Sequence, residues 1–335
     1  MAELIDAYDT AMFDLDGVIY LGPHAIGGSA EGIAGLHERG KRVGFITNNA
    51  ARAATTVSDH LTSLGIPASV DEVLTSSQAG AHLLAQHLQP GAKVLVVGTS
   101  ALADEVRAVG LTVVASATDE PAAVIQGYDP NLDWSSVNEA CYAIHAGAVY
   151  FATNLDRNRP TERGLVPGAG PQIDAVRSSV AVEPVTAGKP DRPLLDEAVR
   201  RWSADRPIFV GDRIDTDIIG ANNVAMDSLF VFTGAHGKLD LLGAGPEGRP
   251  TYIGADMRAL LAPPRVASLA GGRATCGAAE ATIVGSEIRL DQPGGDLEDQ
   301  LDGLWAVAQL AWAQPGLDYT QALDELDLVP AGQGQ

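Results

Sequence analysis

The feature of this sequence that most constrains its fold is a regular alternation of short apolar runs with helical patterns. Strand-like runs at 10–15 and 42–47 alternate with helical patterns at 30–39 and 53–64. Because a strand, a helix and a second strand form the repeating unit of parallel sheets, this order predicts an α/β fold with a Rossmann-like parallel-sheet core. The same rhythm returns at 193–231.

A second series of strand and helix patterns interrupts the first. It starts with the run at 93–97 and reaches the run at 149–153. With 335 residues, the chain is long enough for two or three domains. We therefore expect an inserted α/β domain over residues 81–182, and a core domain built from residues 1–80 and 183–263.

Past residue 263 the sequence changes to Gly, Ala and acidic residues. Two strand-like runs at 281–284 and 287–290 precede a helical pattern at 297–313. The apolar residues of this helix recur at the i, i+3 and i+4 spacing of a buried face. They are Leu301, Leu304, Trp305, Ala308 and Trp312. We expect residues 264–335 to form a small C-terminal α+β appendage, of unknown role, that packs on the core or on a second subunit.

Composition limits the partners of the chain. Its formal net charge of −21 opposes binding to nucleic acid, which depends on Lys and Arg. No run is as long and apolar as a membrane span, and the N-terminus has no signal-peptide pattern. Cys141 and Cys276 have no metal-ligand spacing, so we expect buried free thiols. These observations predict a cytoplasmic protein that binds a small molecule and contacts neither nucleic acid nor membrane, with a homodimer left open.

Two carboxylates follow the first apolar run, at Asp14 and Asp16, directly before Gly17. Residues i and i+2 of a strand point to the same face, and open α/β sheets bind ligands at the carboxyl ends of their strands. One carboxylate could then attack phosphorus while the other donates a proton to the leaving alkoxide. The pair therefore predicts hydrolysis of a phosphate ester. A solvated turn stays an alternative, whereas a calcium loop fits poorly because apolar Val18 and Ile19 follow.

The second strand-like run ends in Thr47, Asn48 and Asn49. A hydroxyl and amides at the carboxyl end of a strand are groups that can bind a phosphoryl oxygen, although such residues also cap helices. Lys189 stands just before a predicted helix and belongs to no Walker motif. Its charge would offset the repulsion between a carboxylate nucleophile and a phosphate dianion, and an ordinary surface lysine is the alternative.

A later apolar run also ends in an aspartate, Asp212, and Asp217 follows five residues on at a predicted helix start. Mg²⁺ prefers oxygen ligands, often one or two carboxylates together with phosphate and water. Asp14 and Asp212 could supply these carboxylates. Asp217 would hold metal-bound water from outside the ligand set, unless it is only an acid at the start of a helix.

Four strand ends that carry Asp-x-Asp, Thr, Lys and Asp in this order, with an inserted domain between the second and the third, resemble the haloacid dehalogenase-like superfamily. More narrowly, they resemble its subfamily with a large α/β cap of the C2 type. That subfamily includes NagD-type nucleotidases and the phosphatases of phosphoglycolate, glycerol phosphate and pyridoxal phosphate. The matching segments are 14–18, 47–49, 152–156, 167–170 and 211–218. The resemblance spans residues 8–262 and leaves out 265–335.

This resemblance implies a role for each motif residue. Asp14 would be the nucleophile, and Asp16 the acid/base whose backbone carbonyl also binds Mg²⁺. Thr47 and Lys189 would hold the phosphoryl group, and Asp212 would complete the metal site. The inserted domain would close over the site as the cap and select the leaving group.

The substrate depends on the cap loop at 154–160. Pyridoxal phosphate phosphatases carry a histidine where this chain has Arg159, which favours a small polar or anionic leaving group unless the loop is merely solvated. We expect a Mg²⁺-dependent phosphatase that hydrolyses glycerol 3-phosphate or phosphoglycolate through an aspartyl phosphate. Pyridoxal phosphate and nucleoside monophosphates stay alternatives. So do a catalytically silent scaffold and a mutase that passes the phosphoryl group to a sugar.

Overall fold

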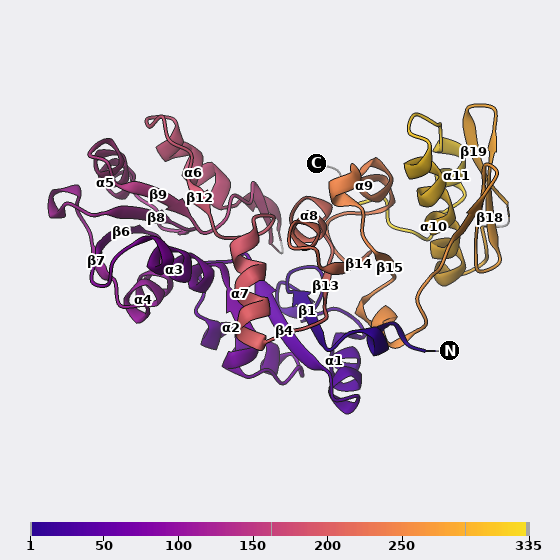
Figure 1. Ribbon diagram of the computed structural model, residues 1–335, viewed down its shortest axis with the longest axis horizontal. Helices are drawn as coiled ribbons and strands as arrows, with labels where there is room; N and C mark the ends of the chain where they lie inside the picture. The colour runs from indigo at the N-terminus through magenta and orange to yellow at the C-terminus, as the bar shows by residue number, and fades with distance from the viewer. Residues whose placement is uncertain (1, 162, 292, 333–335) are drawn as a thin grey trace. The chain divides into compact units, whose positions relative to one another are not determined.

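The computed structural model describes residues 2–161, 163–291 and 293–332 (Figure 1). Contacts divide the chain into two compact units, one of residues 1–43 with 205–335 and one of residues 44–204. Each unit holds parallel strands and helices, so the predicted α/β class is confirmed. Among the described helices, none combines the length and the apolar character that crossing a bilayer requires.

Four parallel strands form the base of the first unit, in the order β15-β14-β13-β1. They are β1 (Thr10–Asp14), β13 (Pro207–Gly211), β14 (Asp227–Val231) and β15 (Tyr252–Gly254). All five residues of β1 are buried, as expected of a strand inside a parallel sheet. Phe13 pairs with Val210, so Asp14 at the end of β1 and Asp212 just after β13 lie at the same edge of the sheet.

Short helices and one hairpin connect these strands. The helices are η1 (Leu4–Ala7), α1 (Ser29–Glu38), the π-helix η4 (Ile214–Ile218), α8 (Ile219–Asn223), α9 (Lys238–Gly243), η5 (Pro246–Gly248) and η6 (Met257–Leu261), and the hairpin consists of β2 (Tyr20–Leu21) and β3 (His24–Ala25). π-Helical turns are rare and occur often at functional sites. Here the π-helix begins two residues after Asp212.

The C-terminal part of this unit is an antiparallel sheet covered by a long helix. Its strands are β16 (Ser268–Ala270), β17 (Arg273–Cys276), β18 (Ala279–Val284) and β19 (Glu287–Asp291), and its helices are α10 (Leu297–Ala313) and α11 (Thr320–Asp324). Figure 1 shows the two helices beside β18 and β19. The predicted α+β character is confirmed, and α10 has the predicted bounds. The sheet has two more strands than the sequence indicated.

This appendage packs on the parallel sheet of its own unit. One buried hydrophobic cluster includes Phe230 and Ile253 from the sheet and Leu304 and Trp305 from α10. The apolar face predicted for α10 is therefore buried, and the segment is no free tail. Its burial against the sheet stabilises both parts, since removing apolar area from water is favourable by about 25 cal/mol per Å².

The second unit contains two sets of parallel strands. In the first set, β4 pairs with β5, with Thr47 opposite Thr75. The second set is a five-stranded sheet in the order β12-β9-β8-β6-β7. The strands are β4 (Arg42–Thr47), β5 (Val73–Thr75), β6 (Lys93–Val97), β7 (Thr112–Val114), β8 (Ala123–Gln126), β9 (Val149–Ala152) and β12 (Val185–Thr186).

Helices and an antiparallel hairpin complete this unit. The hairpin joins β10 (Asn158–Thr161) and β11 (Gly164–Pro167) and carries Arg159 opposite Val166. The helices are α2 (Ala54–Ser63), η2 (Val70–Glu72), α3 (Ser76–His87), α4 (Ser100–Ala108), η3 (Ala117–Asp119), α5 (Trp134–His145), α6 (Ala169–Arg177) and α7 (Arg192–Trp202). The hairpin begins six residues after the end of β9, and Arg159 is the second residue of β10.

Candidate active site

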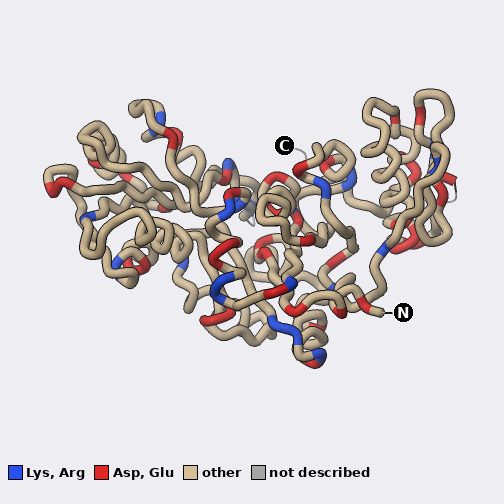
Figure 2. The backbone as a smooth tube through the Cα atoms, in the orientation of Figure 1, with Lys and Arg blue, Asp and Glu red and all other residues tan. Residues whose placement is uncertain are grey.

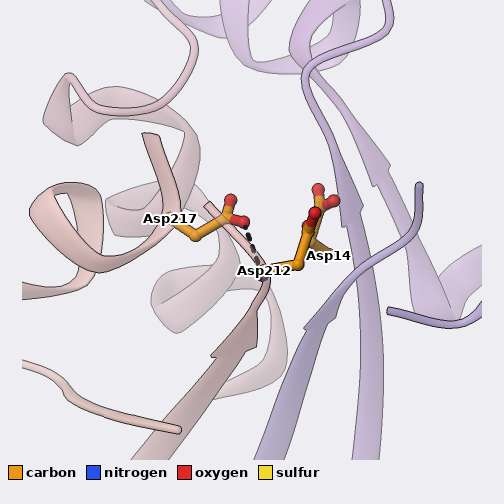
Figure 3. A group of neighbouring side chains, drawn as sticks. All are labelled: Asp14, Asp212 and Asp217. Atoms are coloured by element: carbon orange, nitrogen blue, oxygen red, sulfur yellow. Dashed lines mark hydrogen bonds between the residues drawn. The ribbon is translucent and has the colours of Figure 1, made fainter. Parts of the chain in front are cut away.

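Three aspartates converge at one edge of the sheet in the first unit. Asp14 ends β1, Asp212 follows β13, and Asp217 lies in the π-helix (Figure 3). One carboxylate oxygen of each lies within 4.8 Å of the others. Asp212 and Asp217 are each only 1% exposed, and Asp14 is 9% exposed. The structure therefore brings together the three aspartates that the sequence predicted to lie near one another.

Asp217 acts on the loop that carries Asp212. One of its carboxylate oxygens, Oδ2, accepts hydrogen bonds from the backbone N–H groups of Asp212 and Arg213, each at 3.1 Å. The bond to Asp212 is drawn in Figure 3. Hydrogen bonds to a charged acceptor are stronger than neutral ones, so Asp217 fixes the start of the turn after β13. This contact gives Asp217 a positioning role, in addition to any contact with bound water.

Residues 233–235, which carry no sequence motif, contact Asp212 and the loop after β1. The N–H of Ala235 donates to Asp212 Oδ2 at 2.7 Å, and the hydroxyl of Thr233 donates to the Gly17 carbonyl at 2.6 Å. A Cβ at Gly17, where φ is +94°, would lie 2.5 Å from Asp212 Oδ2, and one at Gly234 would lie closer still. Glycine at both positions lets the backbone approach the carboxylate. Sequence reasoning missed the segment 233–235, because the donor to Asp212 is a backbone N–H, which leaves no residue pattern, and a lone threonine is not distinctive.

The donor set of the three aspartates suits a hard divalent cation. Carboxylates this close repel one another when all are ionised, and a cation between them removes that repulsion. The ligands are oxygen only, which suits Mg²⁺ rather than the softer metals that His and Cys bind. The site therefore fits the magnesium ion that the sequence predicted.

Asp16 lies on the loop after β1, two residues from Asp14. It is half-buried and forms a backbone bridge with Tyr20. Among the described residues, its carboxylate does not belong to the group of three. Its role as the acid that serves the leaving group stays a prediction.

An ion pair flanks the π-helix. Burial works to raise the pKa of Asp215, but hydrogen bonds from Arg213 at 2.7 and 3.0 Å outweigh it and hold that pKa below its usual value. Asp215 therefore stays ionised and is committed to Arg213. This charge pair lies in the segment between Asp212 and Asp217, and among the described residues Asp215 is not part of their carboxylate group.

In the second unit, Asn48 organises the predicted phosphate-binding residues. Its side-chain oxygen accepts from the Lys189 N–H at 2.8 Å, and its amide donates to the Lys189 carbonyl at 2.9 Å. The same amide donates to Asp156 Oδ1 at 3.0 Å. The side chain of Asn48 is therefore engaged within the protein, and it fixes the backbone of Lys189, a residue that is only 2% exposed. A buried lysine at this position does not behave as the surface lysine of the alternative interpretation.

Thr47 and Asn49 form the turn that follows β4. The Thr47 hydroxyl accepts from the Asn49 N–H at 3.1 Å, and the Asn49 side chain accepts from the Ala51 N–H at 2.9 Å. A hydroxyl that accepts one bond still has its own proton to donate. Thr47 can therefore donate to a phosphoryl oxygen, while Asn49 shapes the turn.

Arg159 lies in β10 and packs on Tyr128. Its guanidinium carbon lies 4.8 Å from the centre of the Tyr128 ring, and Nη2 lies 3.0 Å from the Tyr128 hydroxyl, to which it donates. A cation over an aromatic face is held by the charge distribution of the ring. Tyr128 thus fixes the cation that the sequence singled out, and no sequence pattern indicated this partner.

Comparison with known proteins places the chain in a family. Residues 11–112 match the family model of haloacid dehalogenase-like hydrolases, and residues 186–260 match a second family model for hydrolases of this kind. A D-glycerol 3-phosphate phosphatase from Mycobacterium tuberculosis is 41% identical over 330 residues, which are 96% of this chain and 90% of that protein. The chain therefore belongs to the haloacid dehalogenase-like hydrolases.

Other similar proteins also have names that describe enzymes acting on phosphate esters. The 5'-nucleotidase YutF of Bacillus subtilis is 36% identical over 68% of this chain and 88% of its own length. A crystal structure of a glycerol phosphate phosphatase from Mycobacterium tuberculosis, solved in complex with magnesium, has a TM-score of 0.87 and 39% identity. The match covers 98% of this chain and 99% of that one, so it includes the appendage. The chain is a phosphatase of this family, as the motifs predicted.

Proposed function

We propose that this phosphatase hydrolyses glycerol 3-phosphate with Mg²⁺ as its cofactor. The observation that carries the proposal is the buried group of Asp14, Asp212 and Asp217 in a chain that matches a glycerol 3-phosphate phosphatase over 96% of its length. The similarity to a structure solved with magnesium supports the choice of metal. Phosphoglycolate, pyridoxal phosphate and nucleoside monophosphates are the competing substrates, and YutF gives the last of these some support.

We assign the chemical steps to the residues that the motifs singled out. Asp14 attacks phosphorus, and the bond to the glycerol oxygen breaks as Asp16 donates a proton to it. Asp16 then takes a proton from the water that hydrolyses the aspartyl phosphate. Mg²⁺, when bound, would neutralise charge on the phosphoryl oxygens so that a carboxylate can approach. Asp14, Asp212 and the backbone carbonyl of Asp16 would hold it.

The phosphoryl group needs further donors. Thr47 offers its hydroxyl proton, and Lys189 offers a positive charge. We assign Asn48 to positioning, because its side chain is bonded to the Lys189 backbone. Asn49 contributes through the turn it shapes. Asp217 keeps the Asp212 loop in place.

The leaving group is glycerol, which is small and polar. We propose that the inserted domain at 81–182 is the cap over a core of residues 1–80 and 183–263, and that Arg159 faces the substrate from this cap. Its cation would recognise an anionic or hydroxyl-rich leaving group, and Tyr128 would hold it in place.

The partners and the location follow from charge and chemistry. Acidic residues are distributed along the whole described chain (Figure 2), and the net charge of −21 disfavours nucleic acid and anionic membrane surfaces. Cys141 and Cys276 are buried free thiols, as predicted, and free thiols suit a reducing compartment. We infer a cytoplasmic enzyme whose partner is a small phosphorylated metabolite. A homodimer stays a prediction.

A substrate panel tests the proposal. Phosphate release is measured from glycerol 3-phosphate, phosphoglycolate, pyridoxal phosphate and a nucleoside monophosphate, with Mg²⁺ present and after treatment with EDTA. We expect the highest kcat/KM for glycerol 3-phosphate, loss of activity with EDTA, and recovery with Mg²⁺ or Mn²⁺ but not with Zn²⁺. Preference for another ester would refute the substrate assignment, and full activity after exhaustive chelation would refute the metal assignment.

A further inference from the structure

One loop of the first unit is hydrogen-bonded to Asp212 and to the start of the π-helix. We define the buttress loop as residues 233–238. Besides the Ala235 contact to Asp212 Oδ2, the His236 N–H donates to the Asp212 carbonyl at 3.3 Å. His236 Nδ1 accepts from the Ile214 N–H at 2.9 Å. His236 is 7% exposed, so this contact is shielded from water. The buttress loop therefore bonds both to Asp212 and to the start of the π-helix.

The C-terminal end of the described chain is hydrogen-bonded to the same loop. We define the C-terminal clasp as residues 323–332. The Lys238 N–H donates to the Pro330 carbonyl at 2.9 Å, and His236 pairs with Gly332 in an antiparallel bridge. The Lys238 ammonium also donates to the carbonyls of Leu323 at 2.8 Å and Leu326 at 2.6 Å. These three hydrogen bonds and the bridge join segments that lie about 90 residues apart.

The fit between the two segments leaves no room for a side chain. A Cβ added at Gly237 would overlap the backbone nitrogen of Gly332 and the backbone oxygen of Pro330. Backbone atoms cannot rotate away as a side chain can, so a methyl group there has to displace the clasp. By contrast, a Cβ at Gly243, in helix α9 of the same region, would meet nothing within 4 Å.

We propose that the C-terminal clasp sets the affinity of the metal site through the buttress loop, with His236 and Gly237 as positioning residues. The proposal rests on the proposed function, because it takes Asp212 as a ligand of Mg²⁺. The clasp fixes His236 and Lys238, His236 fixes the Ile214 N–H, and Ala235 fixes the Asp212 carboxylate. When the clasp is displaced, Asp212 has to be ordered at the moment the ion binds, and that ordering lowers the affinity.

Mg²⁺ binding without substrate is the direct test, measured by isothermal titration calorimetry on the full chain. The variants are Gly237→Ala and a deletion of residues 330–335, with Gly243→Ala as the matched control. Loss of one or two ordering hydrogen bonds corresponds to about five- to tenfold weaker binding. We expect this loss for both test variants and binding within about twofold of the wild type for the control. At saturating Mg²⁺ the test variants should keep the wild-type KM for substrate.

A pair of substitutions at His236 separates positioning from general destabilisation. In His236→Asn the side-chain oxygen can replace Nδ1 as the acceptor for the Ile214 N–H, whereas His236→Ala cannot. We expect weaker Mg²⁺ binding in the alanine variant and restored binding in the asparagine variant. These variants keep the proposal testable if Gly237→Ala does not fold.

The Mg²⁺ titrations distinguish failure of this inference from failure of the proposed metal site. Wild-type Mg²⁺ affinity in Gly237→Ala, in the deletion and in His236→Ala would overturn this proposal alone. Absence of Mg²⁺ binding by the wild-type chain, or unchanged binding in Asp212→Asn, would overturn the proposed metal site and this inference with it.

Discussion

At the scale of single residues, Asn48 stands out because its side chain is bonded to the backbone of another predicted site residue. It satisfies both the N–H and the carbonyl of Lys189, whose side chain is buried. A lysine held by its backbone presents its ammonium group from a fixed origin, which suits binding of a phosphoryl group. The residue type alone could not have indicated this, because asparagine after a strand also fits a cap or a phosphate ligand.

Asn48→Ala tests this role. The substitution leaves the buried N–H and carbonyl of Lys189 without their partner, a loss of about 1–3 kcal/mol. We expect kcat/KM for glycerol 3-phosphate to fall by roughly ten- to a hundredfold, mainly through KM. Asn138→Ala, on the exposed face of α5, is the control and should match the wild type. Equal kcat/KM in both variants would show that Lys189 needs no help from Asn48.

The residues that the sequence identified are those whose chemistry depends on the side chain. Asp14, Asp212 and Asp217 were predictable as a group, because each follows an apolar run or starts a helix. Gly234 and Ala235 were not predictable, because they act through a small size and a backbone N–H. Tyr128 was missed for a different reason, since its partner Arg159 is 31 residues away and only the folded chain brings them together.

At the scale of elements, clear apolar patterns predicted the bounds of helices and strands well, whereas segments with weak patterns were missed. Helix α10 and strand β4 have the predicted bounds. Helix α3 was not predicted, because half of its 12 residues are Ala, Ser or Gly and it has no clear apolar stripe. Thr75 and Gln78 nevertheless form a capping box at its start. Strands β16 and β17 are three and four residues long and are separated by two glycines. They are too short for an alternation of apolar and polar residues to predict them.

Strand β17 gives a prediction about thiol chemistry. Burial and the neighbouring Asp302 carboxylate, 3.6 Å from Sγ, raise the pKa of Cys276 to about 12. Burial also raises the pKa of Cys141. Because a raised pKa keeps a thiol protonated, both cysteines of the native protein should react slowly with a thiol reagent at pH 8. The same assay after unfolding in guanidinium should count two thiols. Rapid native modification would show that β17 or α5 opens readily.

At the scale of the whole molecule, the appendage is part of the first unit and not an attached module. Leu304 and Trp305 share a buried cluster with Phe230 and Ile253 of the parallel sheet. The sequence predicted that the face of α10 would be buried, but it could not say against which surface, because apolar spacing specifies burial and not the partner. The similar structure that covers the appendage supports its place in this enzyme.

Deleting residues 265–335 tests this integration. The deletion exposes apolar side chains of the sheet, so we expect a lower Tm and lower solubility than the full chain has. Any soluble product should keep phosphatase activity at saturating Mg²⁺, since Asp14, Asp16 and Asp212 lie outside the deleted segment. For comparison, Leu304→Ala should lower the free energy of unfolding by about 2–5 kcal/mol. A stably folded truncation with no activity at any Mg²⁺ concentration would show that the appendage contributes directly to catalysis.

The proposed mechanism depends most on Asp14 acting as the nucleophile of a Mg²⁺-dependent phosphatase. The direct measurement is kcat for phosphate release from glycerol 3-phosphate by the wild type and by Asp14→Asn, with circular dichroism and Tm as controls for folding. An amide cannot attack phosphorus, so we expect a loss on the order of 10³-fold or more in a folded variant. Retention of more than a few per cent of wild-type kcat by folded Asp14→Asn would show that Asp14 is not the nucleophile.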